Sequence, residues 1–196
     1  MLLQRAWTAG RLDLIRSAWR GTGQPRLLEV GCGYGHFLAA ARRRGYDVTG
    51  VELSGPAAEC ARDGLGLTVH QGQLAEADLA GGFDVIAAWD TLEHVPDPVA
   101  FLRTARGLLR DDGLLAFSTP YVTSLPARLL GARWWTLKPA EHIWHYSPAT
   151  HRLVAARGGF AVSQIVRSPL AKANLGRLDS LVGIAYPLPV GAAEAR

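Results

Sequence analysis

The segment Leu27–Leu38 carries the clearest ligand-binding pattern in the chain, in the order L-L-E-V-G-C-G-Y-G-H-F-L. This order predicts a short apolar strand, a glycine-rich turn and the start of a helix. Glycine has no Cβ, so Gly31, Gly33 and Gly35 allow a sharp turn and a close approach of a ligand to the backbone. The spacing differs from the G-x-G-x-x-G of a pyrophosphate loop, and the carboxylate of Glu29 would repel a pyrophosphate. The pattern therefore favours a positively charged ligand.

This segment resembles the first motif of class I S-adenosylmethionine-dependent methyltransferases, and later segments resemble further motifs of that family in the same order. They are a second strand with its ribose-binding acid (Asp47–Glu52), a fourth strand (Phe83–Asp90), the segment that follows it in ubiquinone-pathway O-methyltransferases (Leu92–Pro98) and the approach to a fifth strand (Leu108–Leu115). Two more segments, Gly131–Trp135 and Glu141–Ser147, resemble an insertion between the fifth strand and the last helix of one subgroup. The resemblance spans roughly residues 26–162.

Strands and helices alternate along the chain, which predicts an α/β fold: a Rossmann-like, doubly wound, mostly parallel seven-stranded sheet with a lid insertion after the fifth strand. Asp97 and Ser147, each followed by proline, are expected to begin helices. Six strands are expected at Leu27–Val30, Asp47–Val51, Leu67–His70, Phe83–Trp89, Leu114–Ser118 and Phe160–Val166. The resemblance implies a seventh, antiparallel strand, for which Leu181–Leu188 is a candidate weakened by its prolines and glycine; a reshaped chain end is the alternative.

We expect one domain over residues 1–196. Its parts are an N-terminal helical cap (1–24), a cofactor-binding core (25–119), a substrate lid (120–147) and a C-terminal helix, strand and tail (148–196). Apolar residues recur at helical spacing between positions 2 and 20, which predicts one or two amphipathic helices; the resemblance places them over the cofactor mouth.

The resemblance implies S-adenosylmethionine as the cofactor. Glu29 and the loop of Gly31, Cys32, Gly33 and Gly35 would face its methionine part, with Cys32 acting as a small buried residue rather than a nucleophile. Glu52 lies about 20 residues after the loop, where a carboxylate can accept hydrogen bonds from both ribose hydroxyls.

The remaining cofactor contacts are expected near the adenine and the methionine ammonium. Leu53 would pack on the adenine, and the Gln73 amide and Leu74 backbone would replace the acid that many relatives use there, unless Gln73 is an exposed loop residue. Ala88 and Trp89 end the fourth strand, where backbone carbonyls would meet the ammonium; a core role for Trp89 is the alternative.

His94 is the first candidate for a catalytic base, because imidazole titrates near neutral pH and this loop should open toward the acceptor. Asp90 and Glu93 could orient it, and His142 is a second candidate base. The alternative is that the Glu93–His94 pair fixes the loop by hydrogen bonds. The lid residues expected to contact the acceptor are Trp134, Trp135, Glu141, His145 and Tyr146. No metal is expected, because Glu141, His142 and His145 lack a clear further ligand.

The net charge of +4 comes from scattered arginines, so we expect solvated helix faces rather than a nucleic-acid surface. No signal peptide or uncharged apolar run of membrane-spanning length is evident, and a cytoplasmic monomer or homodimer is expected. The predicted reaction is methyl transfer to a small molecule, on oxygen first and on nitrogen or carbon next. A nicotinamide-dependent oxidoreductase and a cofactor-binding protein without transfer are the alternatives.

Overall fold

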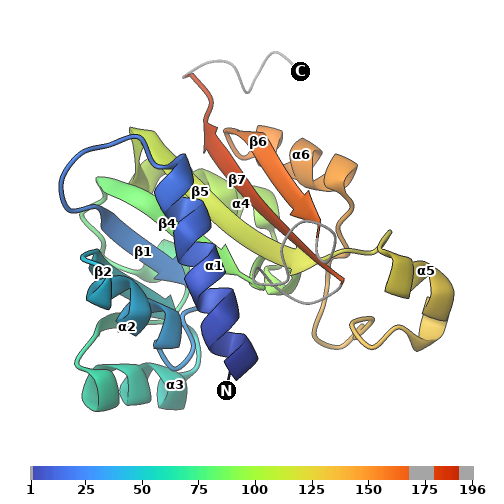
Figure 1. Ribbon diagram of the computed structural model, residues 1–196, viewed down its shortest axis with the longest axis horizontal. Coiled ribbons are helices and arrows are strands. Elements are labelled where there is room, and N and C mark those ends of the chain that lie inside the picture. The colour runs from blue at the N-terminus through green and yellow to red at the C-terminus, as the bar shows by residue number, and fades with distance from the viewer. Residues whose placement is uncertain (1, 168–178, 190–196) are drawn as a thin grey trace.

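A computed structural model describes residues 2–167 and 179–189. Within them, seven strands form one sheet in the order β3-β2-β1-β4-β5-β7-β6 (Figure 1). The strands are β1 (Arg26–Val30), β2 (Asp47–Glu52), β3 (Thr68–Gln71), β4 (Phe83–Trp89), β5 (Leu109–Pro120), β6 (Phe160–Arg167) and β7 (Ser180–Pro187). The first five are parallel, and β7 runs antiparallel to both β5 and β6. The predicted fold class is confirmed.

Helices cover both faces of the sheet (Figure 1). The α-helices are α1 (Leu2–Ala18), α2 (His36–Arg43), α3 (Gly55–Glu59), α4 (Pro98–Leu108), α5 (Leu125–Leu130) and α6 (Pro148–Arg157). Shorter turns are η1 (Cys60–Gly64), η2 (Leu74–Glu76), η3 (Leu92–His94) and η4 (Gly131–Arg133). The side chains of Asp97 and Ser147 cap α4 and α6, as predicted. In the part of the chain that is described, no helix has the length and apolar character needed to cross a membrane.

Successive strand residues point to opposite faces of the sheet and build two separate cores. Leu27 and Val85 pack with α1 and α2 in one core, whereas Leu28 and Ile86 pack with α4 and α6 in the other. All four side chains are fully buried. The two cores hold the ends of β1 and β4 in fixed positions, and the candidate site lies at those ends.

Two predicted elements differ from the structure. The fifth strand was expected at Leu114–Ser118 but runs over Leu109–Pro120, because an irregularity in its pairing with β4 lets an exposed charged run continue the strand. In the segment after β2, Ser54 and Pro56 predict the start of a helix and Gly64 predicts its end. The structure is α-helical only over Gly55–Glu59 and continues as the π-helical turn η1, and the Ser54 side chain makes no capping bond.

The seventh strand that the sequence left open is present as β7. Its glycine has a packing reason, because a Cβ on Gly183 would lie 2.3 Å from the ring of Phe117 on β5. Its proline, Pro187, is the last residue of the strand, where the missing N–H interrupts little pairing.

His151 gives the second core a pH dependence. It is buried in α6 and stacked on Phe117 with ring centroids 4.1 Å apart. Burial lowers the pKa of His151 from its ordinary 6.5 to about 4, because the charged imidazolium is poorly solvated there.

We predict that the free energy of unfolding falls as the pH drops from 6.5 toward about 4, because over this window the unfolded chain binds a proton at His151 that the folded chain does not. The variant His151→Phe should lose this part of the fall, whereas His36→Phe, at an exposed position, should retain it. Urea denaturation between pH 4 and 7.5 measures both. A difference between wild type and His151→Phe that stays constant with pH would contradict the prediction.

Candidate functional site

The predicted cofactor residues gather at the carboxyl ends of β1, β2 and β4. The sheet order places β2 and β3 on one side of β1 and β4 on the other. The side on which successive strands are added therefore changes between β3 and β4. Open parallel sheets bind ligands at such a switch point, outside the carboxyl ends of the strands. The glycine turn follows β1, Glu52 ends β2 and Asp90 follows β4.

The three glycines of the turn have different roles. All have positive φ, at 73°, 51° and 75° for Gly31, Gly33 and Gly35, a region that favours glycine. A Cβ on Gly31 would lie 2.7 Å from the Thr91 hydroxyl, and one on Gly35 would lie 2.5 Å from Leu67. A Cβ on Gly33 would have nothing within 4 Å. Gly31 and Gly35 therefore serve packing, and Gly33 presents its backbone to open space.

Glu52 ties the glycine turn to the end of β2. Its Oε2 accepts a hydrogen bond from the Gly33 N–H at 2.7 Å, and its Oε1 accepts one from the Ser54 N–H at 2.8 Å. A carboxylate has about four lone-pair positions, so each oxygen can accept another bond. The carboxylate is thus fixed in orientation and still able to receive two hydroxyl groups.

Glu29 is on β1, two residues before the glycine turn begins at Gly31. Its side chain is buried, and within the described residues its Oε2 has no hydrogen-bond partner. Burial raises the pKa of Glu29 well above its ordinary 4.5, and the positive charge of Arg11 opposes this rise. Burial also raises the pKa of the neighbouring Cys32 thiol to about 12, which suits a small inert core residue and not a nucleophile.

The three residues predicted to contact the adenine differ in their exposure and in their hydrogen-bond partners. Leu53 is 70% exposed, which leaves its apolar surface open to a ligand. Gln73 forms a capping box with Glu76 at the start of η2, so its side chain already has a structural partner. The Leu74 side chain is buried, and only its backbone matches the predicted role. These adenine contacts stay predictions.

Arg11 of α1 binds the end of β4. Its guanidinium donates to the Asp90 carboxylate and to the Ser118 hydroxyl, both at 3.1 Å, and lies 4.6 Å from the centre of the Trp89 ring. Trp89 is buried against Phe37, and the adjacent Ala88 is fully buried. Sequence reasoning missed Arg11, and its only signal was the helical pattern expected to cover the cofactor mouth.

Asp90 has an unusual backbone for a residue other than glycine, with φ of 51°. The Ser118 hydroxyl donates to its carboxylate at 3.0 Å, and its own N–H donates to the Ser118 carbonyl at 2.9 Å. These bonds and the ion pair with Arg11 hold Asp90 in this conformation at the switch point.

The lid lies between β5 and α6, to one side of the sheet (Figure 1). Trp134 is buried and its indole N–H donates to Asp179, while Tyr146 is buried and its hydroxyl donates to the Leu92 carbonyl. Trp135 is 45% exposed and so has surface left for an acceptor. His145 lies near Trp134, with ring centroids 6.3 Å apart. The predicted acceptor contacts of these residues remain predictions.

The two candidate bases lie together. The rings of His94 and His142 pack edge to face with centroids 4.8 Å apart. His94 Nδ1 lies 2.8 Å from the Glu141 carbonyl, and His142 Nδ1 lies 2.8 Å from the Thr136 carbonyl. A carbonyl only accepts, so each Nδ1 carries the hydrogen and each Nε2 of the neutral ring holds a lone pair. The Glu141 carboxylate is exposed and pairs with Lys138.

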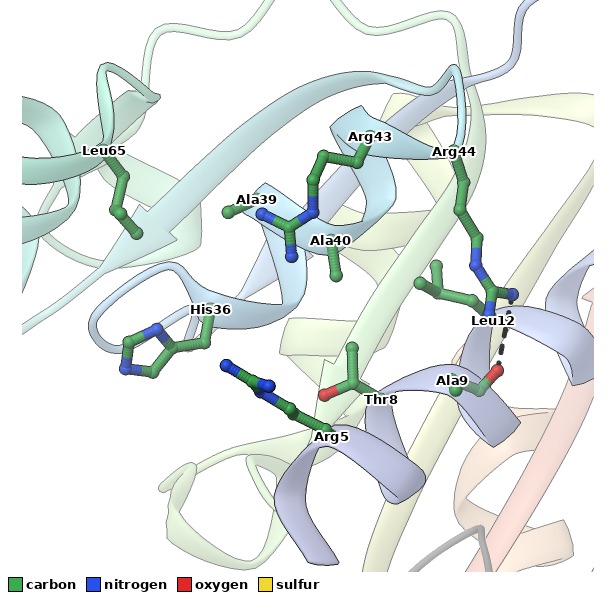
Figure 2. Close-up of a pocket in the computed structure, with 10 residues that line it drawn as sticks. All are labelled: Arg5, Thr8, Ala9, Leu12, His36, Ala39, Ala40, Arg43, Arg44 and Leu65. Atoms are coloured by element: carbon green, nitrogen blue, oxygen red, sulfur yellow. Dashed lines mark hydrogen bonds between the residues drawn. The ribbon is translucent and has the colours of Figure 1, made fainter. Parts of the chain in front are cut away.

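A groove of about 670 Å³ lies between α1 and α2, apart from these residues (Figure 2). In Figure 2 the Arg5 side chain extends from α1 toward His36 at the start of α2, and Arg44 donates a hydrogen bond to the Ala9 carbonyl. None of the predicted site residues lines the groove. The predicted site therefore rests on side-chain geometry at the strand ends and not on this groove.

A family model described as a methyltransferase domain matches residues 3–165. Ubiquinone biosynthesis O-methyltransferase from Actinobacillus pleuropneumoniae is 37% identical over 56% of this chain and 51% of its own length. The enzyme of that name from Cereibacter sphaeroides is 35% identical over 61% of this chain and 52% of its own length. The chain thus spans about half the length of the curated relatives it matches.

Solved structures share the fold. An S-adenosylmethionine-dependent methyltransferase from Mesorhizobium loti has a TM-score of 0.67 at 22% identity and covers 89% of this chain and 96% of its own. Magnesium protoporphyrin IX methyltransferase from Synechocystis, solved with bound SAH, has a TM-score of 0.70 at 17% identity and covers 94% of this chain and 85% of its own.

We predict that Asp90→Ala lowers the free energy of unfolding by about 1–2 kcal/mol more than Asp90→Asn. Asparagine tolerates positive φ and keeps an acceptor for the Ser118 hydroxyl, whereas alanine does neither. Both variants lose the charge that pairs with Arg11, so their difference isolates the backbone and the hydroxyl bond. Chemical denaturation measures it, and equal stability of the two variants would contradict the prediction.

Proposed function

We propose that this chain, which belongs to the methyltransferase domain family, transfers a methyl group from S-adenosylmethionine to a hydroxyl group of a small molecule. The observation that carries the proposal is the fixed Glu52 carboxylate, bonded to Gly33 of a turn that is open to a ligand. The similarity to ubiquinone biosynthesis O-methyltransferases supports oxygen as the acceptor atom.

The chain's residues fit this cofactor. Glu52 has free lone pairs for both ribose hydroxyls, and Gly33 leaves room for a ligand at van der Waals distance from the backbone. Glu29 contributes a buried carboxyl group with an oxygen that no described residue satisfies. Arg11 and Asp90 place one positive and one negative charge side by side, which complements the carboxylate and ammonium of an amino acid.

When bound, S-adenosylmethionine supplies a methyl group on a positively charged sulfur that departs as a neutral thioether. The protein then has to hold the acceptor oxygen in line with that methyl group and to receive the hydroxyl proton. His94 is suited to receive it, because its Nδ1–H is bonded to the Glu141 carbonyl and its Nε2 is left as the basic atom. Its ring is exposed, so an acceptor can reach it.

The acceptor would lie between the strand ends and the lid. Trp135 and Trp144 are 45% and 42% exposed, and these partly open indoles give the lid apolar surface suited to a flat or ring-bearing acceptor. The Trp144 indole N–H donates to the Val95 carbonyl at 2.9 Å, so this ring is held beside the loop that carries His94.

We predict that Glu52→Ala weakens binding of S-adenosylhomocysteine at least about 100-fold, because it removes two charge-assisted hydrogen bonds and releases Gly33. Glu59→Ala, which removes an exposed acid from the nearby helix α3, should leave the affinity unchanged. Isothermal titration calorimetry measures both, with thermal unfolding as the check on folding. The proposal fails if folded wild-type protein does not bind the ligand, or if Glu52→Ala binds it as tightly as wild type.

A further inference from the structure

We propose that Glu93, His94 and His142 form a binding site for one divalent transition-metal ion, of the class that includes Zn²⁺ and Co²⁺. The site lies where the lid meets the end of β4. The sequence predicts no metal, and the carboxylate that it places beside His142 is Glu141. The proposed site uses Glu93 instead.

The three side chains are close enough to share an ion. Their ligand atoms all lie within 4.8 Å of one another. Ligands bound at about 2.1 Å in a tetrahedral arrangement are about 3.4 Å apart, so modest side-chain rotations would complete the site. His145 lies farther away, with its ring centroid 6.5 Å from that of His142.

Both imidazoles already have the outer bonds that metal-binding histidines use. Each donates its Nδ1–H to a backbone carbonyl, at Glu141 for His94 and at Thr136 for His142. This bond fixes the ring and leaves Nε2 as the lone-pair atom that a metal takes. Because both neutral rings carry their hydrogen on Nδ1, their Nε2 atoms are both acceptors and cannot hydrogen-bond to each other, although the rings are in contact.

Glu93 supplies the third ligand, a role that the sequence pattern did not indicate. Its side chain is 1% exposed, and within the described part of the chain its Oε2 has no hydrogen-bond partner. A buried carboxylate is costly unless a hydrogen bond, an opposite charge or a metal satisfies it. An ion held jointly with the two histidines would provide that charge.

The donor set selects the class of ion. Two imidazole nitrogens and one carboxylate oxygen suit Zn²⁺, Co²⁺, Fe²⁺ or Mn²⁺ better than Mg²⁺ or Ca²⁺, which prefer oxygen ligands. Three protein ligands leave a coordination position open, and His94 is exposed, so a small molecule could reach the ion.

The site also explains how the lid is fastened. The backbone N–H groups of Ile143 and Trp144 in the lid both donate to the Glu93 carbonyl. The ion would add a second link between the same two segments, since Glu93 and His94 belong to η3 and His142 to the lid. With the ion bound, His94 Nε2 would be a metal ligand and could not also receive a proton, so the ion would take over the activation of the acceptor hydroxyl that is otherwise assigned to His94. That role of the ion rests on the proposed function, but the binding site itself does not.

The test is a titration of chelator-treated, metal-free protein with Co²⁺, followed by visible absorption. We expect one equivalent to bind with the intense bands of a four- or five-coordinate site. His94→Ala and Glu93→Gln should each weaken binding at least tenfold. Glu141→Gln makes the same carboxylate-to-amide change at an exposed acid of the lid and should bind Co²⁺ as wild type does.

Circular dichroism shows whether each variant is folded, and calorimetry with S-adenosylhomocysteine tests the proposed function separately. If wild-type protein does not bind Co²⁺, the proposed metal site is wrong, even if S-adenosylhomocysteine binds. Unchanged Co²⁺ affinity in folded His94→Ala and Glu93→Gln also overturns it, because the ion would then be bound elsewhere.

Discussion

The bond between the Glu52 carboxylate and the Gly33 amide is the contact on which the candidate site depends. Parallel pairing places Val30 opposite Val51, so β1 and β2 end side by side, and the Gly31 and Cys32 amides both donate to the Val51 carbonyl. The glycine turn therefore begins against β2, and Glu52 holds its apex. The pairing of β1 with β2 therefore accounts for both features of the site: the open position at Gly33 and the Glu52 carboxylate that faces it.

The acceptor side is assembled from segments that are far apart in the sequence. Arg11 reaches from α1 to Asp90, and the lid bonds to the carbonyl of Glu93 just beyond. Both residues follow β4, whose end is fixed by cores on the two faces of the sheet. Cofactor and acceptor would thus meet at a rigid strand end, while the helix and the lid determine what can approach it.

The sequence predicts those parts of the protein whose structure is set by residues close together in the chain. The glycine turn, Glu52 and most strands follow from spacing and strand length. The strand β7 stayed an open candidate, because the packing reason for its glycine is the ring of Phe117, which lies on another strand. Arg11 was missed because its partner Asp90 is 79 residues away. Glu93 was missed as a ligand because its burial and its nearness to His142 depend on how the lid folds back, which no local pattern encodes.

The most direct test of the central claim is a crystal structure of the chain with S-adenosylhomocysteine. The account predicts both ribose hydroxyls within about 3 Å of the Glu52 carboxylate oxygens, the amino-acid end of the ligand along the Gly31–Gly35 turn, and the Gly33–Glu52 bond still in place. A ligand bound in the groove between α1 and α2, or a Glu52 side chain turned away from the ribose, would contradict the account.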